Sequence, residues 1–139
     1  MAKISELSAS AVLTGDELVV VVQGGVTYRS TVAQVRRVPI TDSTVTALTL
    51  ALTHAGGIVR QSNAGAITTT VPANATVAFP IGTSIGLRQV AAGAITVSPA
   101  GGVTINTPSG HTAVSRAQGS SLALIKVATD TWDLTGDLA

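Results

Sequence analysis

Residues 64–106 constrain the fold more than any other part of the sequence, because short alternating runs are separated there by turn residues. Gly, Pro and Asn interrupt the runs, and a side-chain period of two places one parity on one side of a pleated sheet. Short strands between turn signals predict an all-β fold, a small antiparallel β-sandwich or barrel. The residues of shared parity are Ile67, Thr69, Val71, Val77, Phe79, Ile81, Ile85, Leu87, Ile95, Val97, Val103 and Ile105.

The remaining residues of a predicted β domain, 44–139, extend this pattern. Residues 44–53 carry leucines at every second position near their end, which predicts a strand, with a short helix as the alternative. The sequence Gly-Ala-Ile-Thr occurs at 65–68 and again at 93–96, an echo that equivalent hairpins would explain. No longer internal repeat is evident at this level.

A hairpin of residues 121–128 and 131–135 is predicted to close the domain. In its first strand Leu122 and Leu124 share one face, and the opposite face is apolar as well. A strand that is apolar on both faces is either central in a sheet or buried at a subunit interface. Both interpretations stay open from the residues alone.

Residues 1–38 form a separate predicted segment, joined to the β domain by a linker at 38–43. Residues 18–23 are a β-branched run, Gly24-Gly25 is a hairpin signal, and residues 26–30 make the return strand. A short helix is expected to follow at residues 31–37. Because a two-stranded hairpin is marginally stable in water, we expect this segment to dock onto something else.

Composition favours association with other protein chains. Charged residues make up 11% of the 139 residues, against a typical figure of about 25%, and aromatic residues only 2%. The net charge of +1 with no basic block argues against nucleic acid as a partner. The longest apolar run, residues 18–22, is too short for a membrane span, and no export signal follows Met1.

No pattern of residues predicts catalysis, a metal site or a cofactor, so the sequence does not indicate an enzyme. His54 and His111 have no acidic residue or second histidine near them in sequence, and cysteine is absent. No phosphate-binding glycine loop or nucleophile elbow is present. Calcium binding by Asp130, Asp133 and Asp137 is the alternative to a turn and a solvated tail. Trp132 is expected to fill the core beside Phe79, with a sugar platform as the alternative.

Arginines are the residues we expect at a subunit interface, because their planar fork pairs well with carboxylates of a neighbouring chain. With the two leucines of the C-terminal hairpin they make the predicted interface set: Arg60, Arg88, Arg116, Leu122 and Leu124. The alternative for the arginines is a solvated surface position.

Two parts of the chain resemble virion proteins of tailed bacteriophages. Residues 4–35 contain I-S-x-L, L-T-G-x-E-L and V-V-Q-x-G-x-T-x-R in the order that opens many phage fibre proteins. Residues 63–138 resemble a β domain of phage tail fibres, head fibres and decoration proteins. The segments that carry this second resemblance are 75–83, 102–108 and 124–138.

The resemblance implies a non-enzymatic structural protein, usually a homotrimer, with its N-terminal segment facing the particle. The chain shows neither a shaft nor a receptor-binding tip, which favours a capsid decoration (cement) protein or short head fibre on the outer capsid surface, assembled in the host cytoplasm. The implied partners are the major capsid protein and other virion proteins, without nucleic acid, membrane or cofactor. A tail fibre or tail adaptor and a carbohydrate-binding module are the alternatives. The expected capsid-attachment residues are Ile4, Leu7, Leu13, Val20, Val22, Tyr28 and Arg29.

Overall fold

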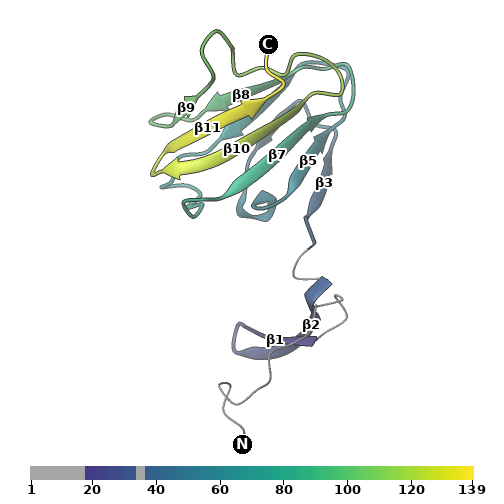
Figure 1. The fold of residues 1–139 in the computed structure, drawn as a ribbon, viewed down its shortest axis with the longest axis vertical. Coiled ribbons are helices and arrows are strands. Elements are labelled where there is room, and N and C mark those ends of the chain that lie inside the picture. Colours follow the sequence, from purple (N-terminus) through teal and green to yellow (C-terminus); the bar gives the residue numbers. More distant parts are fainter. Residues whose placement is uncertain (1–17, 34–36) are drawn as a thin grey trace, which may run out of the picture. The chain divides into compact units, whose positions relative to one another are not determined.

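The computed structural model describes residues 18–33 and 37–139, and the chain divides into two compact units, Met1–Arg37 and Val38–Ala139. The fold is mostly β, with strands in three sheets (Figure 1). Each unit is described by itself below.

In the first unit, β1 (Leu18–Gln23) pairs antiparallel with β2 (Val26–Thr31). Gly24 and Gly25 connect them with φ angles of 57° and 78°. Two consecutive positive φ values define the tight turn whose twist suits two-residue hairpins, and glycine adopts them without a steric cost. The helix expected at 31–37 is described only at residues 32–33; Thr31 ends β2, Arg37 is not helical, and residues 34–36 lie outside the described ranges.

In the second unit, strands are distributed between a six-stranded and a three-stranded sheet, and neither sheet closes into a barrel. Figure 1 shows most strands of the larger sheet side by side. The larger sheet has the order β3 (Ile40–Ser43), β5 (Ile58–Gln61), β7 (Ser84–Gln89), β10 (Ser121–Ala128), β11 (Thr131–Gly136) and β9 (Thr104–Asn106). The smaller sheet has the order β4 (Ala47–Thr49), β6 (Ile67–Val71) and β8 (Ile95–Pro99).

The expectation of an antiparallel domain is wrong for most of these pairings. Strands β3, β5 and β7 pair in parallel, as do β4, β6 and β8, and β9 with β11. From β3 to β8 the chain alternates between the two sheets, so it re-enters each sheet in the same direction after a full coil. Parallel neighbours require such a long crossover connection, which the turn signals alone do not distinguish from hairpins. Antiparallel strand pairs in this unit join β7 to β10 and β10 to β11, and Thr96 of β8 makes an isolated antiparallel bridge with Val114.

Two successive coils repeat with a period of 28 residues. Ile58 pairs with Gly86 in the larger sheet, and Ile67 pairs with Ile95 in the smaller one. The sequence shows the same period, because Arg-Gln-x-x-Ala-Gly-Ala-Ile-Thr occurs at 60–68 and at 88–96. The Gly-Ala-Ile-Thr echo therefore stacks in parallel register, and its explanation by hairpins is wrong.

The glycines of this repeat stack backbone against backbone. The amide of Gly93 donates to the carbonyl oxygen of Asn63 over 2.9 Å. A Cβ atom on Gly93 would overlap the carbonyl oxygen of Gly65 and lie 2.6 Å from that of Asn63. The close approach of the two coils thus explains the glycine at position 93, whereas a Cβ on Gly65 would meet no atom closer than 3.4 Å.

Buried glutamines occupy the equivalent position in both coils. Gln61 and Gln89 are register partners, and both are almost fully buried. The side-chain Oε1 of Gln61 accepts a hydrogen bond from the Thr69 hydroxyl over 3.0 Å, and Oε1 of Gln89 accepts one from the Ser115 hydroxyl over 2.6 Å. These side chains tie the strands of the larger sheet to the segments that face them.

One hydrophobic core lies between the two sheets of the second unit and includes residues from both. The rings of Phe79 and Trp132 meet edge to face, with centroids 5.4 Å apart, as expected for two large side chains in a core of aliphatic residues. The buried hydrophobic residues are Leu50, Val59, Ile67, Val71, Phe79, Ile85, Leu87, Ile95, Val97, Val103, Leu122, Leu124, Trp132, Leu134 and Leu138.

Two of the predicted strands are shorter or absent. In the segment 44–53 the strand β4 spans three residues and a 3-10 turn, Leu52–His54, follows it, so Leu52 is exposed while Leu50 is buried. The run at 77–81 is a loop. The buried ammonium group of Lys126 holds this loop, donating to the side-chain oxygen of Asn74 over 2.5 Å and to the carbonyl oxygen of Phe79 over 2.8 Å.

Candidate interaction surfaces

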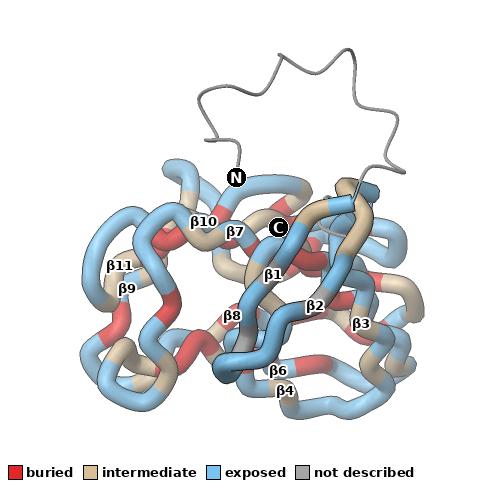
Figure 2. The backbone as a smooth tube through the Cα atoms, turned by 90° about the horizontal axis from the view of Figure 1, so that it is seen from below, coloured by how far each residue is buried: buried red, intermediate tan, exposed pale blue. Residues whose placement is uncertain are grey.

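The β1–β2 hairpin presents aliphatic side chains to solvent on one face. Leu18, Val20 and Val22 share one parity and are 61%, 70% and 66% exposed. In Figure 2, those residues of β1 and β2 whose burial is described are exposed or intermediate. Exposed aliphatic groups gathered on one face are typical of a surface that binds another protein. We call these three residues the hairpin face.

The structure places part of the predicted attachment set on this face. Val20 and Val22 belong to it, and Arg29 is the register partner of Val20 on β2. Tyr28 is the register partner of Val21. The remaining predicted attachment residues, Ile4, Leu7 and Leu13, lie outside the described residues.

The second candidate surface is the outward side of the six-stranded sheet, which we call the outer face. Along β5, β7 and β10 buried and outward positions alternate. The outward positions combine aliphatic, charged and small side chains. They include Ile40, Asp42, Ile58, Arg60, Ser84, Gly86, Arg88, Ser121, Ala123, Ile125, Val127, Thr131, Asp133 and Thr135.

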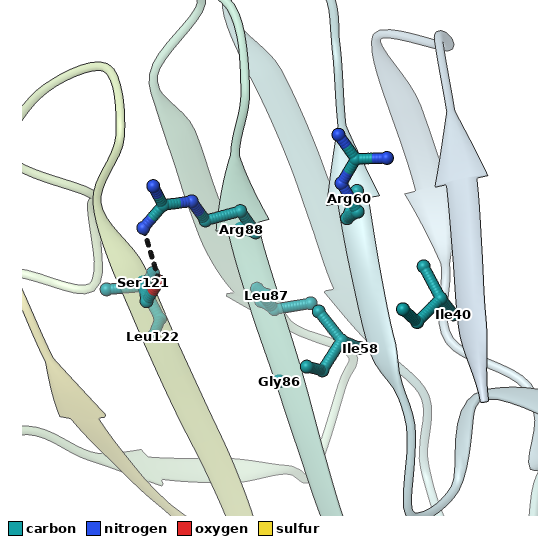
Figure 3. A pocket seen from close by; sticks show the side chains of 8 residues that line it. All are labelled: Ile40, Ile58, Arg60, Gly86, Leu87, Arg88, Ser121 and Leu122. Carbon is teal, nitrogen blue, oxygen red and sulfur yellow. Dashed lines mark hydrogen bonds between the residues drawn. The ribbon is translucent and has the colours of Figure 1, made fainter. Parts of the chain in front are cut away.

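An open hollow of about 350 Å³ lies on the outer face (Figure 3). It forms where Gly86 has no side chain, beside Ile58, whose Cγ1 atom would lie 3.1 Å from a Cβ on that glycine. Ile40 and the two arginines also line it. The hollow is therefore apolar at its base and cationic at one end.

The two arginines of the outer face differ in how their charges are compensated. Arg60 makes an ion pair with Asp42, with Nη1 2.7 Å from Oδ1. Its neighbour Arg88 donates to the hydroxyl of Ser121 over 2.8 Å. Among residues 18–33 and 37–139, Arg88 has no carboxylate within ion-pair distance.

The structure separates the other members of the predicted interface set from this pair. Arg116 lies in the loop before β10 and contacts its own chain's Asp137, with Nε 2.6 Å from Oδ1. Hydrogen bonds from Arg116 and then Ser120 lower the pKa of Asp137, and the same contact raises the pKa of Arg116. Leu122 and Leu124 are buried in the core of their own chain, which leaves them no surface for a neighbour.

The sequence reasoning missed two features of the outer face. The first is the 28-residue repeat, which places Arg60 and Arg88 side by side as register partners. The sequence signal for this repeat is the nine-residue motif at 60–68 and 88–96, and only its last four residues were interpreted from the sequence alone. The second is the hollow, which depends on the small residue at position 86 rather than on any motif.

His54, Asp130 and Asp133 each contact a different neighbour and do not form one cluster. His54 accepts a hydrogen bond from the amide of Ala51 at Nδ1, and partial burial lowers its pKa. The side-chain oxygens of Asp130 and Asp133 accept from the Asn74 amide and the Asn106 side chain. Within 18–33 and 37–139, no three His, Cys, Asp or Glu residues converge as metal ligands would.

Over the same described ranges, no helix has the length and apolar character that crossing a membrane requires.

The exposed residues described above form two surfaces suited to protein contacts, the hairpin face and the outer face. Comparison with protein-family models, with curated proteins and with solved structures finds no match to this chain.

Proposed function

We propose that this chain is a non-enzymatic structural protein of a phage virion, a capsid decoration protein or short head fibre that binds the outer capsid surface as a homotrimer. The sequence resemblance described above suggests this class. The observation that carries the proposal is the hairpin face, three exposed aliphatic side chains in a unit separate from the packed core.

In this proposal the two units have different tasks. The N-terminal hairpin, with the short helix expected after it, grips the capsid, where its strands can add to an exposed sheet edge of the major capsid protein. The C-terminal unit, in which two sheets share a core in the manner of a sandwich, faces outward. Binding only to the mature shell stabilises that shell by mass action, and no chemical step is needed.

The test is binding of the full chain to purified capsids that lack it, measured by co-sedimentation over a concentration series. The variant Val20→Asp/Val22→Asp introduces two charges on the hairpin face, and we expect at least about a hundredfold weaker binding, since each buried unpaired charge costs several kcal/mol. The matched control Ile81→Asp changes an equally exposed residue of the second unit, and its binding should equal that of the unmodified chain.

Saturable binding by the Val20→Asp/Val22→Asp variant, at unmodified affinity, would remove the hairpin face from the proposal. Labelled antibody on the virion that carries the protein then locates it by electron microscopy. Label over the head supports decoration. Label confined to the tail replaces the proposal with the tail-fibre or adaptor alternative.

A further inference from the structure

Two opposite charges on the outer face lack an ionic partner among residues 18–33 and 37–139. Arg88 donates only to a hydroxyl, and Asp133 accepts from the side-chain amide of Asn106 over 2.8 Å. In the described part of the chain, neither group has an opposite charge within 4.0 Å. The neighbouring Arg60, by contrast, is neutralised by Asp42.

Strand register places these two charges at opposite corners of one patch. Arg88 pairs with Ser121 on β10, and Asp133 pairs with Ile125 on the same strand. Ala123 lies midway between those two β10 residues, so the line from Arg88 to Asp133 passes over it. From strand geometry the two charges lie about 13 Å apart along the strands and about 10 Å apart across them.

The outer face carries partly exposed aliphatic side chains on both sides of Arg88. Ile125 and Val127 on β10 are about 40% exposed and lie toward Asp133, whereas Ile58 on β5, also about 40% exposed, and Ile40 on β3, 63% exposed, lie on the far side of Arg88. The hollow at Gly86 leaves room there for a side chain from another molecule. A face that carries a cation and an anion without ionic partners, beside exposed aliphatic side chains, is complementary in charge to a second copy of itself.

We infer that the outer face is where copies of this chain meet, with Arg88 of one copy paired to Asp133 of the neighbouring copy. This inference deepens the proposed homotrimer and rests on the chain's self-association, but not on its attachment to a capsid. In the proposed homotrimer, a ring of three uses the Arg88–Asp133 pair once at each contact. The same pair could instead form twice between two facing copies related by a twofold axis over Ala123, which would give a dimer in place of the homotrimer.

The test is sedimentation velocity of the full chain over a concentration series, with circular dichroism to verify folding. Arg88→Asp or Asp133→Arg alone puts two like charges at the contact, and we expect at least tenfold weaker self-association. Arg88→Asp/Asp133→Arg exchanges the two charges and should restore association. Arg116→Asp makes the same charge change in a loop off the sheet and serves as the matched control, with association unchanged.

Three results would overturn the inference: association that survives both single reversals, an exchange variant that stays dissociated, or an unmodified chain that is monomeric. If a reversed variant does not fold, Arg88→Gln and Asp133→Asn remove one charge each and should also weaken association. The capsid co-sedimentation assay measures binding through the hairpin face and does not depend on the Arg88–Asp133 pair. Failure of the charge pair and failure of the proposed function are therefore distinguishable.

Mixing the two single variants tests the symmetry. In a twofold dimer of unlike copies, both contacts join opposite charges, so the mixture associates. In a trimer at least one contact joins two copies of the same variant and therefore two like charges, so the mixture stays dissociated while the exchange variant associates. Either result, together with a restored exchange variant, supports the pair and assigns its symmetry.

Discussion

The molecule contains two antiparallel hairpins of similar local chemistry and opposite burial. Both β1–β2 and β10–β11 carry aliphatic side chains at every second position of one face, Leu18, Val20 and Val22 in β1 and Leu122 and Leu124 in β10, and turn through two residues. Val20 and Val22 are at least 66% exposed, whereas Leu122 and Leu124 are at most 3% exposed. The difference arises because β7 and β9 flank the second hairpin and the core lies beneath it. Alternation thus marks a face that can be buried, and neighbours decide whether it is.

The largest expected effect contrasts glycines from the two units. Gly93→Ala forces a Cβ into the backbone of the adjacent coil, and we expect a loss of at least about 4 kcal/mol of unfolding free energy or no folded protein. Gly24→Ala meets nothing within 4 Å and strains only a positive φ, at about 1 kcal/mol confined to the hairpin. Urea unfolding followed by fluorescence of Trp132, the single tryptophan, reports the second unit alone. Equal midpoints for the two variants would contradict the close stacking of coils.

A second pair of variants compares core and hairpin side chains directly. Leu124→Ala leaves a cavity in the core, and we expect it to lower the unfolding free energy by about 2–5 kcal/mol in the same urea assay. Val20→Ala removes an exposed side chain, so a change within about 0.5 kcal/mol is expected. A large loss from Val20→Ala would show that the hairpin face is covered in the free protein.

The smallest expected effect concerns the exposed contact between Arg116 and Asp137. Because hydrogen bonds lower the pKa of Asp137 in the folded chain, the contact stabilises the fold above the unfolded-state pKa, near 3.8. That contribution is lost as pH falls through the lower folded-state value. Asp137→Asn should therefore show a flatter dependence of unfolding midpoint on pH between about 5 and 2. An unchanged slope would mean that the ion pair does not contribute.

How much of the fold the sequence predicts depends on whether the decisive contact is local. The hairpin turns could be predicted, because Gly24-Gly25 and Asp130, with a φ of 54°, carry their own conformational requirement. The parallel coils could not be predicted from alternation, since a strand's parity is the same in either direction. The repeat at 60–68 and 88–96 does indicate the parallel coils. Strands that pair at the same offset of 28 residues in both sheets must belong to coils stacked on one another.

The interaction surfaces were predictable to different degrees. Val20 and Val22 stand out in a β-branched run, and the prediction that they attach to another protein needed only the absence of a local core. Leu122 and Leu124 looked the same in sequence, and their burial depends on β7, which is distant along the chain. From the sequence, Asp133 belongs with Asp130 and Asp137 to a turn and a solvated tail, with calcium binding as the alternative. Its position diagonal to Arg88 follows from strand register, which the spacing of these residues does not reveal.

The 28-residue coil also has a consequence for how such a protein could change during evolution. Because the offset is the same in both sheets, a tandem duplication of 28 codons within this region would add one whole layer without shifting any register. Each added layer would carry another arginine to the row that begins with Asp42, and that single acid would still neutralise only one of them. The positive electrostatic potential of the outer face would then increase with each added layer. A change in the number of layers would therefore change which copies of the chain attract one another.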